Sequence, residues 1–85
     1  MEYKFHGWKV TAIQFNDTEH LLYMDKNPIE AKKNYEDCFY SILTAEEQKE
    51  INQIKLERWN GTASKGQWVH QEFLNVPMVS HDYFA

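Results

Sequence analysis

Hydrophobic and polar residues alternate along two stretches near the start of the chain, and this period of two predicts β-strands. Within residues 3–15, apolar side chains occupy every second position at Trp8, Val10 and Ala12. The cluster Asn16-Asp17-Thr18 predicts a turn, because Asn and Asp tolerate turn backbone angles and bond their own backbone. Residues 19–25 form a second run, whose alternation predicts Leu21 and Tyr23 on one face and Leu22 and Met24 on the other. The two runs together predict an antiparallel hairpin.

A helix start at Pro28 is the clearest local signal in the chain. Asn27 supplies an N-cap acceptor, and Pro28 occupies the first helical position, where a missing N–H removes no hydrogen bond. Glu30 stands where its carboxylate can reach back to the cap amide. Apolar residues then recur at helical spacing up to position 42, at Ala31, Tyr35, Cys38, Phe39 and Ile42. The pattern predicts an amphipathic helix over 28–42.

The second half of the chain predicts a short helix and two further strands. Thr44 followed by Glu47 repeats the cap pattern, which indicates either a separate helix over 45–50 or a kinked continuation of the first helix. Residues 51–59 and 67–74 alternate in the manner of strands, and a loop rich in turn residues joins them into a hairpin.

The order strand, strand, helix, strand, strand predicts an α+β fold, with a small antiparallel sheet and one main helix packed on one face. We expect a single domain over 1–78 and a C-terminal tail over 79–85. The chain has only 85 residues, so its core is thin, and its 13 aromatic side chains must supply much of it. Four residues are predicted to be buried between helix and sheet: Phe39, Ile42, Ile54 and Leu56.

The charge balance limits the classes of partner. Thirteen Asp and Glu against nine Lys and Arg give a formal net charge of −4. This balance argues against non-specific binding of nucleic acid, which depends on neutralising phosphates with Lys and Arg. No stretch approaches the roughly 18 apolar residues of a membrane span. We therefore expect no membrane association.

Cys38 is the single cysteine, so no disulfide can form within the chain. Small secreted domains usually need disulfides, and the first residues lack the cationic and apolar run of a secretion signal. The sequence thus predicts a protein of the cytoplasm. The four histidines have no ligand spacing with one another or with Cys38, so neither a metal nor another cofactor is predicted.

His70 and Glu72 are the one pair that favours acid–base catalysis. Strand alternation places both on the same face as Trp68, where a histidine and a carboxylate could exchange protons. The same three residues equally fit an ordinary polar face of a strand. A chain of this length also has little room for a substrate pocket, so we do not expect an enzyme.

A macromolecule-binding surface is predicted between 56 and 69. Trp and Arg are enriched where interfaces concentrate their binding energy, and the loop between 60 and 66 is longer than a tight hairpin turn, which favours a displayed surface. The candidate binding residues are Arg58, Trp59, Lys65 and Trp68. The sequence therefore predicts a small non-enzymatic protein that binds another protein. A homodimer is one form of this, because self-association would enlarge a thin core.

Binding of single-stranded nucleic acid is the alternative function. Aromatic side chains interleaved with Lys55, Arg58 and Lys65 resemble the stacking platforms that bind single strands. A purely structural interpretation stands beside both: Trp59 and Trp68 would pair across the hairpin only to hold it together.

Overall fold

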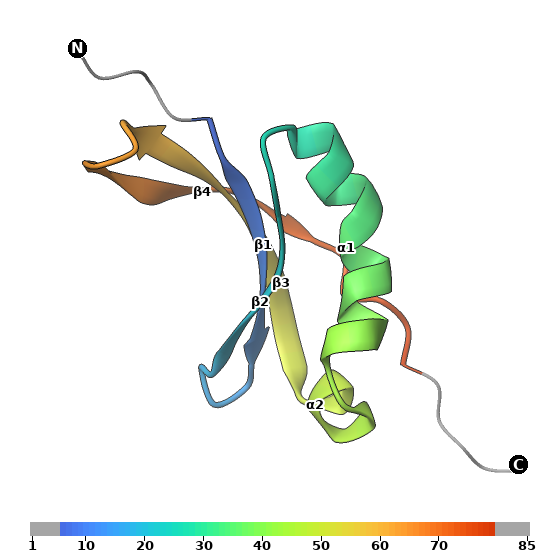
Figure 1. The fold of residues 1–85 in the computed structure, drawn as a ribbon. Coiled ribbons are helices and arrows are strands. Elements are labelled where there is room, and N and C mark those ends of the chain that lie inside the picture. The colour runs from blue at the N-terminus through green and yellow to red at the C-terminus, as the bar shows by residue number, and fades with distance from the viewer. Residues whose placement is uncertain (1–5, 80–85) are drawn as a thin grey trace, which may run out of the picture.

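The computed structural model describes residues 6–79, which form a helical layer on a four-stranded sheet (Figure 1). The elements in chain order are β1 (Trp8–Gln14), β2 (Glu19–Asp25), α1 (Pro28–Ile42), α2 (Ala45–Lys49), β3 (Ile51–Gly61) and β4 (Gly66–Leu74). The strands lie in the order β2-β1-β3-β4, and each pair of neighbours is antiparallel. The predicted α+β class is confirmed. Residues 3–5 of the first predicted strand, and the tail beyond Val79, lie outside the described part.

Both helix starts follow the predicted cap chemistry, with one change. The Asn27 side chain accepts a hydrogen bond of 2.8 Å from the Ile29 N–H. The Asn27 N–H donates to Asp25 Oδ1 at 2.9 Å, so Asp25 takes the place expected for Glu30. Since Asp25 ends β2, the same carboxylate links the last residue of the strand to the cap of α1.

The two helices are separate. Thr44 and Glu47 form a complete capping box at the start of α2. Before it, the chain leaves the helical conformation at Leu43, where the backbone is extended. No helix within residues 6–79 has the length and apolar character needed to cross a bilayer.

The core lies between α1 and the sheet. Its buried members are Val10, Ala12, Leu22, Ala31, Tyr35, Phe39, Leu43, Ile51, Ile54 and Leu56. Burial of Phe39, Ile54 and Leu56 is confirmed, but the prediction for Ile42 is wrong, since its side chain is 52% exposed. Because the backbone becomes extended at the next residue, Leu43 turns inward and fills the end of the core in its place.

Each edge strand contains one extra residue, and this changes which side chains share a face. In β2, Val10 pairs with Tyr23 and Thr11 with Leu21, so Leu22 is the inserted residue. In β4, Leu56 pairs with Glu72 and Glu57 with His70, so Gln71 is inserted. A bulge of this kind reverses the alternation beyond it. The sequence pattern of strict alternation is therefore wrong for both edge strands.

The position of Phe39 generates a stability prediction. Phe39 is fully buried on the side of α1 that faces the sheet, so Phe39→Ala should lower the free energy of unfolding by about 3–5 kcal/mol. Ile42→Ala, three positions further on, should change it by less than about 1 kcal/mol. Urea or thermal unfolding of both variants measures the difference, and equal losses would show that the helix face is misassigned.

Asp25 gives a second prediction, for the pH dependence of stability. The hydrogen bond from the Asn27 N–H, together with that from the Tyr23 hydroxyl, holds the pKa of Asp25 below its ordinary value. A carboxyl with a lowered pKa in the folded state stabilises the protein above its unfolded pKa of about 4 and loses that contribution as the pH falls below it. Asp25→Asn should therefore reduce stability at about pH 6.5 and much less at about pH 3.

Urea midpoints at both pH values test this expectation. Asp37→Asn, which removes one charge from an exposed position of α1, is the matched control for net charge. A loss in Asp25→Asn that is the same at both pH values would contradict the assignment.

Candidate functional site

One face of the sheet carries the helices, and the opposite face is not covered by them (Figure 1). We call the uncovered side the open face. Register and alternation place two complete rows of side chains on it. Read in the order β2, β1, β3, β4, these are Met24, Lys9, Glu57, His70 and then Leu21, Thr11, Lys55, Phe73. Trp59 and Trp68 follow at the hairpin end, and Glu19 and Gln53 at the other end.

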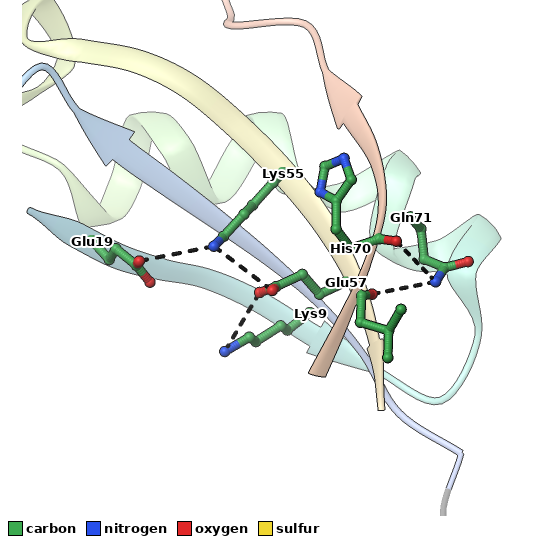
Figure 2. Close-up of polar contacts among 7 residues, drawn as sticks. Lys9, Glu19, Lys55, Glu57, His70 and Gln71 are labelled. Atoms are coloured by element: carbon green, nitrogen blue, oxygen red, sulfur yellow. Dashed lines mark hydrogen bonds and ion pairs between the residues drawn. The ribbon is translucent and has the colours of Figure 1, made fainter. Parts of the chain in front are cut away.

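A chain of ion pairs crosses the centre of the open face, as Figure 2 shows. Glu57 lies between two ammonium groups, with 3.7 Å from its carboxylate to both Lys9 and Lys55. Lys55 also reaches Glu19 at 3.8 Å. The four groups balance, with two positive and two negative charges. The Glu57 side chain is only 12% exposed, so its neighbours screen it from water, and an unpaired charge there would be costly.

The predicted contact between Trp59 and Trp68 is confirmed. The residues are direct partners across β3 and β4, and their rings meet edge to face with centroids 5.2 Å apart. The Lys9 ammonium lies 4.6 Å from the centre of the Trp68 ring, a cation–π distance. The Trp59 indole N–H donates to the Thr62 carbonyl at 2.8 Å. Trp59 therefore helps to hold the hairpin turn.

The hairpin loop is shorter than the sequence suggests. Gly61 and Gly66 still pair with each other, so only 62–65 turn the chain. Gly61 has a φ of +140°, a conformation that favours glycine. A Cβ on Gly66 would lie 2.5 Å from the Asn60 carbonyl and 3.0 Å from the Trp59 ring. The turn is closed tightly by its own backbone and by Trp59, rather than extended as a displayed loop.

The four residues predicted to bind a partner do not share one face. Trp59 and Trp68 lie together, but alternation turns Arg58 to the helix side, where its backbone neighbours are Trp8 and Val69. Lys65 lies exposed in the turn, and its N–H bonds the Thr62 hydroxyl at 3.2 Å. The cation beside the tryptophans is instead Lys9. No local pattern could reveal it, because it comes from β1, far away in sequence.

His70 and Glu72 were expected on one face, and that expectation is wrong. The bulge at Gln71 sends them to opposite sides. Glu72 points to the helix layer and binds Lys32 of α1 at 2.9 Å. His70 stays on the open face, with its ring 4.5 Å from that of Phe73. The Gln71 amide donates to the carbonyls of His70 and Val69, at 3.2 and 3.3 Å (Figure 2).

Groups with ligand or nucleophile chemistry are dispersed over the described part of the molecule. Within residues 6–79, no three side chains of His, Cys, Asp or Glu come close enough together to hold a metal ion. Cys38 is half-buried and packs against the core, as its place on the apolar stripe predicts.

The indole hydrogen bond of Trp59 generates a third prediction. Trp59→Phe keeps an aromatic ring but removes the donor to Thr62, so the free energy of unfolding should fall by about 1 kcal/mol more than in Trp68→Phe. Trp68→Phe is the matched control, because it makes the same change of volume on the partner ring. Denaturant unfolding measures both variants, and equal losses would contradict a role for Trp59 in closing the turn.

Comparison of the chain with models of protein families, with characterised proteins and with solved structures gave no match. The described residues present an uncovered sheet face with an ion-paired centre and with Leu21, Met24 and Phe73 at its margins.

Proposed function

We propose that this protein acts by binding another protein through its open face, without catalysing a reaction. One observation carries the proposal: three of the side chains at the margins of this face are large, apolar and about half exposed. The exposed fractions are 51% for Leu21, 47% for Met24 and 58% for Phe73. Leu21 and Met24 are neighbours on β2, and grouped apolar side chains on an uncovered face are typical of an interaction surface, whereas isolated ones are not.

The charges on the open face favour a protein over a nucleic acid. Lys9 and Lys55 are both paired with Glu57, and Lys55 also with Glu19. Phosphate binding needs an excess of positive charge, and here the two signs balance. The aromatic rings at the β4 margin would allow stacking, but no surplus cation accompanies them on this face.

The non-enzymatic part of the proposal rests on the separation of His70 from Glu72 by the sheet itself. A proton relay needs its two groups within hydrogen-bond reach. We also propose an intracellular location, because a small domain with a single cysteine gains nothing from an oxidising compartment.

Affinity capture with matched variants tests the function. The purified chain is immobilised, and retained proteins are identified by mass spectrometry from an extract of the source cells. Phe73→Ser and Met24→Ser should each reduce the retained partner at least about tenfold, the scale of a lost interface contact of 1.4 kcal/mol. Ile29→Ser, which removes a 71% exposed side chain from α1, should retain it in full.

Equal retention by all four proteins would contradict the use of the open face. A labelled oligothymidine supplies the second arm, read by fluorescence anisotropy at low and physiological salt. We expect no binding. An affinity that falls steeply with salt and is lost in Trp68→Ala would establish the nucleic-acid function instead.

A further inference from the structure

We infer that the occupant of the open face is a second copy of this chain, packed face to face about a twofold axis that runs parallel to the strands between β1 and β3. The inference rests on the proposed function and names its partner. Packing two sheets with their strands nearly aligned is one of the two common arrangements of sheet on sheet. A closed twofold dimer is also the commonest oligomer of soluble proteins.

The two rows of the open face are nearly symmetric about that axis. In the row Met24, Lys9, Glu57, His70, the two oppositely charged groups stand on the middle strands, and in the row Leu21, Thr11, Lys55, Phe73, an apolar side chain stands at each end. Rotation by a half-turn lays β1 of one copy over β3 of the other, and β2 over β4. Leu21 then meets Phe73 of the second copy. The exposed margins of both copies become buried against each other.

The charged centre is complementary under the same rotation. Lys9 lies opposite Glu57 of the second copy, and this contact occurs twice. Lys55 lies opposite Thr11, so no like charges face each other directly.

The distribution of net charge also permits this arrangement. The chain carries −4 overall, but the four ion-paired groups of the open face cancel. Residues 28–50, on the helix side, contain six acidic and three basic residues, a net charge of −3. Contact through the open face places these acidic surfaces on the outside of the dimer, where water and salt screen their repulsion.

The sheet edges are less suited to the same purpose. Both edge strands are bulged, at Leu22 and at Gln71, and bulges are a common device against pairing between edges. In β4, the Gln71 amide also occupies the carbonyls of Val69 and His70. The same two bulges that disturb the edges direct Leu21, Met24, His70 and Phe73 onto the open face.

The size of the open face determines how tightly the two copies are expected to associate. Four strands about 4.8 Å apart and the positions from Gln53 to Trp59, at about 3.4 Å each, give a plane of roughly 19 by 24 Å. The area of this plane is less than the ~800 Å² of surface that each partner buries in a standard stable complex. We therefore expect a dimer that dissociates on dilution, with a dissociation constant of about micromolar or weaker.

Sedimentation and light scattering of the full chain test the inference, over concentrations from about 10 µM to about 1 mM. The mass should rise toward twice the 10.2 kDa of one chain. Leu21→Lys and Phe73→Glu should each remain monomeric throughout. Ile29→Lys, an exposed apolar position on α1, should dimerise like the unaltered protein. Circular dichroism confirms that each variant is folded.

The double variant Leu21→Lys with Phe73→Glu tests the axis itself. These positions face each other only across the proposed twofold, so opposite charges placed there should restore the dimer. A monomer at every concentration, or a dimer that persists in Leu21→Lys, would overturn the second copy as occupant. Neither result would affect the capture experiment, in which loss of a different protein by Phe73→Ser would still support the proposed function.

Discussion

The two residues inserted in the edge strands, Leu22 and Gln71, determine the composition of both sheet faces. Side chains alternate between the two faces along a regular strand. One bulged residue therefore places every side chain beyond it on the face opposite to the one that strict alternation of the sequence predicts. In β2, the insertion adds Leu22 to the core and leaves Leu21 and Met24 outside. In β4, it sends Glu72 to the helix layer and Phe73 to the open face. The exposed apolar side chains at the two margins of the open face therefore have the same structural cause.

The helix layer depends on this arrangement as well. Tyr23 lies on the helix side opposite Val10, and its hydroxyl binds Asp25, whose carboxylate also receives the cap amide of α1. At the other margin, Glu72 binds Lys32 of the same helix. Ions exposed at the surface contribute little to stability, but these contacts fix the helix relative to both edges of the sheet. Packing of Phe39 against the sheet provides the larger energy.

The sequence predicts local features of this molecule well and non-local ones poorly. The caps at Asn27 and Thr44 involve neighbouring residues, and both are confirmed. The pair Trp59 and Trp68 also follows from one hairpin. A bulge, in contrast, is visible only when the partner strand is known. For this reason strict alternation placed His70 beside Glu72 and could not find Lys9 beside the tryptophans. The open face likewise combines residues of four strands, which no local pattern brings together.

A bulge also changes how such a surface can evolve. Deletion of the single codon for Gln71 would remove the extra residue and leave the pairing with β3 unchanged, because Glu72 would then follow His70 directly on the opposite face. Phe73 would stay on the open face, and Glu72 would stay on the helix side within reach of Lys32. The extra residue can therefore be lost in one step without remodelling either face of the sheet, whereas substitution of a paired residue such as Phe73 changes the open face directly.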